Sequence, residues 1–243
     1  MLRPMRGTPT WLLPALLLAL AGCSGLLREA APPPGNDTAA VHTGTLVSST
    51  GCTLRYRRFD ADTRTRAGDL VVLAHGFLRS QERMRVLAEA IAADGVDVVT
   101  LDFCNPRPWN GRHVQNARDM QTIAQAQGAR RVVYAGFSAG ALAAVVAARL
   151  DPSAIGVVAL DLVDTGDIGV RAARGLDKPL LGLAGEATNC NAMGNGRAVY
   201  AAAERARVVR ILGAGHCDFE GPTDGLCELL CENPSGRAVA PTP

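Results

Sequence analysis

The chain has 243 residues, of which 48% are hydrophobic and 20% are charged, and its formal net charge is +2. Two of its 25 basic residues, Arg3 and Arg6, precede an apolar N-terminal segment, and the other basic residues balance the 23 acidic ones. A nearly neutral chain lacks the basic surface that nucleic acid requires, so we expect no nucleic-acid partner.

The apolar N-terminal segment, residues 11–20, is too short to span a bilayer comfortably and is typical of a signal peptide. It ends in Leu20-Ala21-Gly22-Cys23, which resembles the bacterial lipobox. The resemblance implies cleavage before Cys23 and attachment of a lipid to that cysteine. An ordinary secretory signal that is cut nearby is the alternative.

Four segments are expected along the chain: a signal peptide over residues 1–22, a lipidated linker over 23–40, one domain over 41–232 and a tail over 233–243. The linker contains a Pro-Pro-Pro-Gly run without apolar periodicity. About 200 residues suffice for one domain and are too few for two ordinary ones. We expect a monomer held to a membrane of the bacterial cell envelope, on the periplasmic or extracellular side, and Ser24 is compatible with an outer membrane.

The chain has seven cysteines, and assigning Cys23 to a lipid leaves six. An even number in an exported protein favours three disulfides, although the sequence allows fifteen connectivities. The scattered spacing, without a Cys-x-x-Cys pair, disfavours a zinc site, so no metal is expected. The disulfide candidates are Cys52, Cys104, Cys190, Cys217, Cys227 and Cys231.

The domain is predicted to begin with a hairpin, because residues 41–47 and 53–59 alternate in polarity around a turn. Strands and helices then alternate, which predicts an α/β fold with a mainly parallel sheet and helices on both faces. The expected strands are 70–74, 96–101, 131–135, 154–160, 179–184 and 207–212. The expected helices are 84–95, a segment through 120–124 that ends at 128, 139–150 and 197–206.

The pentapeptide Gly136-Phe137-Ser138-Ala139-Gly140 lies at a predicted strand-to-helix junction. Such a sharp turn leaves the serine hydroxyl exposed, where a nucleophile can act. Taken alone, the motif also fits a turn whose serine caps the following helix. The neighbouring strands therefore have to supply the context.

In a parallel sheet, ligands bind at the carboxyl ends of the strands. His75-Gly76-Phe77 follows the first parallel strand, Asp161 follows the strand after Ser138, and His216 follows the last strand. With the serine turn and this order of serine, acid and histidine, residues 41–232 resemble the α/β-hydrolase family. The resemblance implies an eight-stranded fold, a Ser-Asp-His triad and no cofactor.

By this resemblance, Ser138 is the nucleophile and His216 is its general base. The backbone N–H groups of Phe77 and Ala139 are expected to bind the oxyanion of the tetrahedral intermediate. His75 is expected to support the oxyanion loop rather than act as the base.

The acid of the triad is predicted to be Asp161, with Glu186 and Asp164 as alternatives. Many of these hydrolases carry the acid one strand later, near Glu186, but Thr188 stands where related enzymes have an aspartate. The stretch around Asp161 resembles that of chlorophyllases and platelet-activating-factor acetylhydrolases, and the chain as a whole resembles the lidless esterases of these families and of the dienelactone hydrolase group. Phe137 replaces the histidine of the chlorophyllase motif, so chlorophyll is not carried over as a substrate.

The segment between Asp161 and Pro179 is too short for a cap domain, which leaves the site accessible to small or bulky esters. Four aromatic residues either line a substrate pocket or belong to the core: Phe77, Trp109, Phe137 and Phe219. Cys217, beside the base, is expected to form a disulfide that tethers the histidine loop.

The sequence therefore predicts a lipid-anchored esterase without a lid, which acts through an acyl-enzyme intermediate. A peptidase or amidase with the same triad, and a non-catalytic envelope lipoprotein that kept the fold for binding, are the alternatives.

Overall fold

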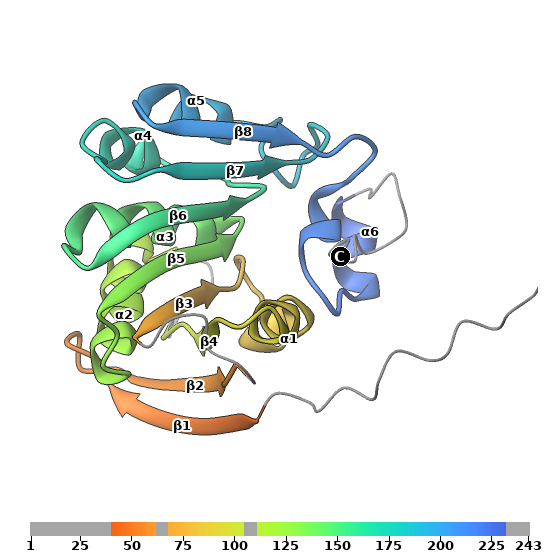
Figure 1. Ribbon diagram of the computed structural model, residues 1–243. Helices are drawn as coiled ribbons and strands as arrows, with labels where there is room; N and C mark the ends of the chain where they lie inside the picture. Colours follow the sequence, from red (N-terminus) through yellow and green to blue (C-terminus); the bar gives the residue numbers. More distant parts are fainter. Residues whose placement is uncertain (1–39, 62–67, 105–110, 232–243) are drawn as a thin grey trace, which may run out of the picture. The chain divides into compact units, whose positions relative to one another are not determined.

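The computed structural model describes residues 40–61, 68–104 and 111–231 (Figure 1). The expected signal peptide, Cys23, Trp109 and the C-terminal tail lie outside this part of the chain. None of the described helices is long and apolar enough to cross a membrane.

One eight-stranded sheet forms the centre of the domain, in the order β1-β2-β4-β3-β5-β6-β7-β8 (Figure 1). β1 (Val41–Val47) and β2 (Thr53–Phe59) form the predicted antiparallel hairpin, and β2 also pairs antiparallel with β4 (Asp97–Asp102). All other neighbours are parallel, which confirms the predicted α/β class. The remaining strands are β3 (Asp69–Ala74), β5 (Arg131–Phe137), β6 (Ala154–Leu160), β7 (Leu180–Ala184) and β8 (Ala206–Arg210).

Helices cover both faces of this sheet (Figure 1). One face carries α2 (His113–Ala126), α3 (Ala139–Leu150), α4 (Ile168–Ala173) and α5 (Gly196–Ala202). The other face carries α1 (Arg85–Ala93), which follows the 3₁₀ turn η1 (Gln81–Met84), and the segment around Phe219. A second 3₁₀ turn, η3 (His216–Phe219), and the helix α6 (Gly225–Cys231) complete the described chain.

The two-sided cover explains the sequence pattern of the central strands. In β3, Leu70, Val72 and Ala74 pack into the core under α2 and α3, whereas Val71 and Leu73 pack on the side of α1. Both sets of side chains are buried, so the strand is apolar without alternation. The residues of α3 from Gly140 to Ala148 are also buried, since this helix packs between the sheet, α2 and α4.

Four elements differ most from the sequence prediction, and several others differ by one or two residues at an end. α5 ends at Ala202 rather than at 206, because Ala203 is already extended and the chain must enter β8 in register with β7. β8 covers residues 206–210 instead of 207–212. The short helices α4 and α6 were not predicted, because six or seven residues give too few turns for a periodic pattern. α4 is the one helix between β6 and β7, a segment that is described throughout, so no cap domain separates these strands.

Candidate active site

Ser138 occupies the sharp turn between β5 and α3. Its backbone has φ 55° and ψ −118°, a conformation that residues other than glycine rarely adopt. Such a conformation costs roughly 1–3 kcal/mol and persists where the surroundings impose it. The flanking glycines show why: a Cβ on Gly136 would lie 2.5 Å from the backbone of Gly140, and one on Gly140 would lie 2.4 Å from the carbonyl oxygen of His75.

Three buried side chains from three strand ends form a continuous hydrogen-bond chain. Ser138 Oγ lies 3.1 Å from Nε2 of His216, and Nδ1 of His216 lies 2.6 Å from Oδ2 of Asp161. An ionised carboxylate can only accept, so Nδ1 carries the proton and Nε2 is left as the acceptor for the serine hydroxyl. The Phe137 ring contacts the imidazole, with ring centroids 4.6 Å apart, and limits its rotation.

The carboxylate of Asp161 is held by two further donors. Oδ1 accepts a hydrogen bond from the backbone N–H of Gly185 at 2.9 Å, and Oδ2 accepts one from Nδ2 of Asn191 at 3.1 Å. The Asn191 amide also donates to the carbonyl of Glu186, and its Oδ1 accepts from the N–H groups of Thr188 and Gly194. Asn191 is thus locked in place, and with 1% exposure it is shielded from water.

Sequence reasoning missed Asn191. The residue lies in an irregular loop after β7, and no motif or periodicity distinguishes it from the neighbouring Asn189 and Asn195. Its proximity to Asp161, thirty positions earlier, arises from the pairing of β6 with β7.

The two alternative acids have other partners in the structure. The Glu186 carboxylate forms an ion pair with Arg210 and accepts a hydrogen bond from the N–H of Gly213, and these contacts lower its pKa. The Asp164 carboxylate accepts hydrogen bonds from the N–H groups of Thr165, Gly169 and Val170 at the start of α4. Neither carboxylate contacts His216, whereas Asp161 does.

The loop after β3 lies directly against Ser138. A Cβ on Gly76 would meet the Phe137 ring at 2.9 Å and the Ser138 side chain at 3.3 Å. Within the described residues, the N–H groups of Phe77 and Ala139, both predicted oxyanion donors, have no hydrogen-bond acceptor. Both residues are next to Ser138, Phe77 across the loop and Ala139 along the chain.

His75 ties this loop to the end of β4. Its Nδ1 lies 2.7 Å from the carbonyl oxygen of Gly76, and its Nε2 accepts from the N–H of Phe103 at 3.3 Å. Burial lowers the pKa of His75, so the ring is neutral near pH 7 and can make both contacts. The contacts agree with the supporting role that the family resemblance implies for this residue.

A partly buried ion-pair cluster joins the loop after β3 to the segment after His216. Arg79 donates to both carboxylate oxygens of Glu220, which is 3% exposed, and to Asp224. Burial opposes the charge on Arg79, but the hydrogen bonds to Glu220 and Asp224 outweigh it and raise the pKa of the guanidinium. Arg83 binds the same Asp224 and the carbonyl oxygens of Pro222 and Thr223.

All six candidate cysteines are paired in disulfides: Cys52–Cys104, Cys190–Cys231 and Cys217–Cys227. The last two lie side by side at the site, and Sγ of Cys227 is 3.9 Å from Sγ of Cys231. They attach the loop after β7 and the histidine loop to α6. Because each of these sulfurs belongs to a disulfide, their close grouping offers no free thiolates to a metal.

Two cavities open next to Ser138. The first, which we call the His216 cavity, has a volume of about 200 Å³ and is lined by Phe77, Leu78, Arg79, Phe137, Ser138, Cys190, His216, Cys227, Leu230 and Cys231. The second, the His113 cavity, has a volume of about 450 Å³ and is lined by Phe77, Gly111, His113, Ser138, Val163, Thr165, Gly166, Ile168 and Cys190. Of the predicted aromatic lining, Phe77 and Phe137 face these cavities, whereas Phe219 belongs to the core.

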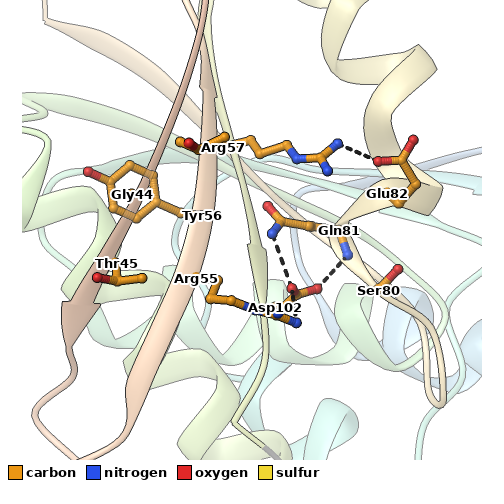
Figure 2. Close-up of a pocket in the computed structure, with 10 residues that line it drawn as sticks. Gly44, Thr45, Arg55, Tyr56, Arg57, Ser80, Gln81, Glu82 and Asp102 are labelled. Carbon is orange, nitrogen blue, oxygen red and sulfur yellow. Dashed lines mark hydrogen bonds and ion pairs between the residues drawn. The ribbon is translucent and has the colours of Figure 1, made fainter.

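A larger cavity of about 570 Å³ lies elsewhere, between the β1–β2 hairpin and η1, and none of the three hydrogen-bonded site residues lines it (Figure 2). Its charged side chains bind one another: Arg57 pairs with Glu82, Arg55 pairs with Asp102, and Gln81 donates to Asp102 (Figure 2). With these groups already paired, the hollow offers little to a ligand.

Solved structures of hydrolases share this architecture. A dienelactone hydrolase from Anabaena variabilis is 23% identical, with a TM-score of 0.61 over 76% of this chain and 91% of that one. An esterase domain from a Rhodothermus marinus protein is 17% identical, with a TM-score of 0.59 over 73% of this chain and 90% of that one. A membrane phospholipase A, described as a bacterial virulence factor, is 15% identical, with a TM-score of 0.59 over 75% of this chain and 82% of that one.

No protein-family model matches the sequence, and no curated protein matches it. At these identities the structural similarities establish the fold alone. The chain has the α/β-hydrolase fold, as its sequence resemblance predicts.

Proposed function

We propose that the protein is a serine hydrolase that cleaves carboxylic esters, with Ser138 as nucleophile, His216 as general base and Asp161 as the acid that orients it. The observation that carries this proposal is the hydrogen-bond chain from Ser138 Oγ through His216 to Asp161, which ends at two cavities. The fold supports it, because an esterase domain, a dienelactone hydrolase and a phospholipase A have the same architecture.

The reaction begins when Nε2 of His216 removes the proton from Ser138 Oγ, and the oxygen attacks the ester carbonyl carbon. The C=O electron pair moves to the oxygen and gives a tetrahedral oxyanion. When the C–O bond to the alcohol breaks, the imidazolium returns the proton to the departing oxygen. A water molecule then repeats both steps on the acyl-enzyme and releases the acid, with Asp161 stabilising the imidazolium each time.

The oxyanion is assigned to the N–H groups of Phe77 and Ala139. One such donor contributes about 2.7–4 kcal/mol of transition-state stabilisation. The strained turn at Ser138 supports this assignment, because in such a turn the N–H of the residue after the serine is available to bind the oxyanion.

A fluorophosphonate probe and a p-nitrophenyl ester test the proposal together. We expect the folded wild type to be labelled and to hydrolyse the ester, and Ser138→Ala to lose both properties. Asp161→Asn is expected to lower turnover by about 10⁴-fold, because the imidazole takes the wrong tautomer. Glu186→Gln is the matched control and should leave turnover near the wild-type value. An unlabelled wild type, or a large loss in Glu186→Gln instead of Asp161→Asn, would contradict the assignment.

We also propose that the protein is exported and anchored through a lipid on Cys23. Three disulfides among the described cysteines support an oxidising compartment. Cells that express the full chain should incorporate labelled palmitate into the wild type but not into Cys23→Ser. Equal labelling of both proteins would refute the anchor.

A further inference from the structure

The two cavities at Ser138 differ in which catalytic side chain they contain. Both are lined by Phe77, Ser138 and Cys190, but the imidazole of His216 lines only the smaller one among the described residues. A substrate bound to Ser138 therefore meets two chemically different surroundings. If the proposed function holds, the catalytic geometry decides which part of an ester enters which cavity.

The leaving oxygen must lie within hydrogen-bond reach of His216 Nε2, because that nitrogen protonates it as the C–O bond breaks. The alcohol attached to this oxygen consequently extends into the His216 cavity. The acyl group stays bonded to Ser138 Oγ and extends away from the imidazole. The His113 cavity, which also opens at Ser138, is the remaining space for it.

The His216 cavity is small and mainly apolar. Its walls are the rings of Phe77 and Phe137, the side chains of Leu78 and Leu230, and the sulfurs of two disulfides. Arg79 is the one arginine or lysine in its lining, and its guanidinium is bound to Glu220 and Asp224. With a volume of about 200 Å³ and no unpaired charge, this cavity suits a compact aliphatic alcohol.

The His113 cavity is larger, and its lining is mixed. Val163 and Ile168 provide apolar surface, whereas His113 and Thr165 provide polar groups. Within the described residues, the His113 side chain makes no hydrogen bond, and its Nδ1 is a buried polar atom without a partner. Burial lowers the pKa of His113, so the ring is neutral near pH 7 and offers one donor and one acceptor.

We propose that the substrate is an ester of a compact aliphatic alcohol with a larger acyl group that carries a hydrogen-bonding substituent, such as a hydroxyl, recognised by His113. This proposal rests on the proposed function and names its substrate class. The His113 ring lines the cavity and is not hydrogen-bonded to any described residue, so a polar substituent that reaches the ring gains a partner that an unsubstituted acyl group does not use.

The alcohol half is tested with one acid esterified to methanol, propanol or butanol. In the wild type, kcat/KM should rise about fourfold per methylene that enters the cavity, from roughly 0.8 kcal/mol for each buried CH₂. Leu230→Ser should reduce this rise severalfold without changing the methyl ester much. Leu229→Ser is the matched control, because Leu229 is also an exposed leucine of α6 but does not line the cavity.

The acyl half is tested with methyl butyrate and methyl 3-hydroxybutyrate. The wild type should prefer the hydroxy ester, and His113→Phe, which keeps a ring of similar size, should reduce that preference about tenfold, while Thr165→Val should reduce it less. Val114→Ala is the control on the same helix, because Val114 is exposed and lies outside the cavity lining. Thermal unfolding of each variant separates a loss of folding from a change of selectivity.

The outcomes distinguish the two proposals. The assignment is supported if the wild type hydrolyses the esters, Leu230→Ser reduces the rise of kcat/KM with alcohol length, and His113→Phe reduces the preference for the hydroxy ester. Hydrolysis in which Leu230→Ser alters acyl selectivity, or in which neither variant alters any selectivity, overturns the assignment and leaves the esterase intact. A folded wild type that hydrolyses no ester and escapes the fluorophosphonate overturns both.

Discussion

Replacing Asn191 by alanine removes a single buried amide that holds the carboxylate of Asp161. The hydrogen bond from Nδ2 of Asn191 to Oδ2 of Asp161 is 3.1 Å long, and the same Oδ2 accepts a hydrogen bond from Nδ1 of His216. Without the amide, the backbone N–H of Gly185 is the remaining donor that holds the Asp161 carboxylate apart from His216 itself. The carboxylate can then rotate, and the imidazole loses its fixed orientation toward Ser138.

The size of the effect follows from the kind of bond that is lost. A hydrogen bond to a charged acceptor contributes about 1.5–3 kcal/mol. If the whole amount is expressed in the transition state, kcat falls by roughly 10- to 150-fold. This is well below the loss of about 10⁴-fold expected when the acid itself is replaced. KM should change little, because Asn191 lines neither cavity at Ser138.

Asn195 provides a matched control in the same loop. Its amide donates to the carbonyl of Asp164 at 2.8 Å and accepts from the N–H of Asp164 at 3.0 Å, so it also joins the loop to the segment after β6. Both alanine variants lose hydrogen bonds at this junction, and each should be less stable by about 2 kcal/mol. Only Asn191→Ala should lower kcat strongly.

Steady-state kinetics on one p-nitrophenyl ester, with thermal unfolding of both variants, completes the test. Equal losses of kcat in Asn191→Ala and Asn195→Ala would show that the loop acts through stability alone. A rise in KM at constant kcat would show that Asn191 affects substrate binding, and either result would refute its role in positioning Asp161.

Three further changes give measurable outcomes. Gly140→Ala should destabilise the fold by about 1–3 kcal/mol in chemical denaturation, because the new Cβ would lie 2.4 Å from the carbonyl oxygen of His75; unchanged stability would disprove the close packing. Burial lowers the pKa of His75 below its ordinary value of 6.5. The stability that the neutral ring contributes is therefore complete above about pH 6.5 and is lost as the pH falls. The decrease in melting temperature between about pH 7 and pH 5 should be smaller in His75→Asn than in the wild type. Removing the Cys190–Cys231 disulfide by a double serine substitution should lower the free energy of unfolding by about 2–4 kcal/mol and weaken the selectivity for the alcohol. Removing Cys52–Cys104, which lines neither cavity at Ser138, should lower the free energy of unfolding without changing that selectivity.

The elements that could be predicted are those with a repeating pattern long enough to be distinctive. The hairpin strands have the predicted bounds, and so do α3 and β6, because alternation and continuous apolar runs follow directly from which faces are covered. α4 and α6 are too short for such a pattern. α6 in particular keeps Leu229 and Leu230 exposed, and two disulfides tether it.

At the site, the serine turn could be predicted because its chemistry is local. Gly136 and Gly140 are required by contacts within the turn and with the adjacent strand end, and both positions are visible in a pentapeptide. The choice among Asp161, Asp164 and Glu186 was not local, since all three follow strands at the same edge of the sheet. Their separate hydrogen-bond partners distinguish them only once the loops are in place.

The sequence alone thus determined the α/β class and the order along the chain in which Ser138, Asp161 and His216 follow their strands. Tertiary structure alone decided the pairing of the six cysteines, the contact of Asn191 with Asp161, and the placement of His113 at a cavity beside Ser138. The physical reason is that the apolar periodicity of a strand or helix is a property of residues that lie close together in the sequence. A side-chain contact between segments dozens of residues apart depends on loop paths that no local pattern encodes.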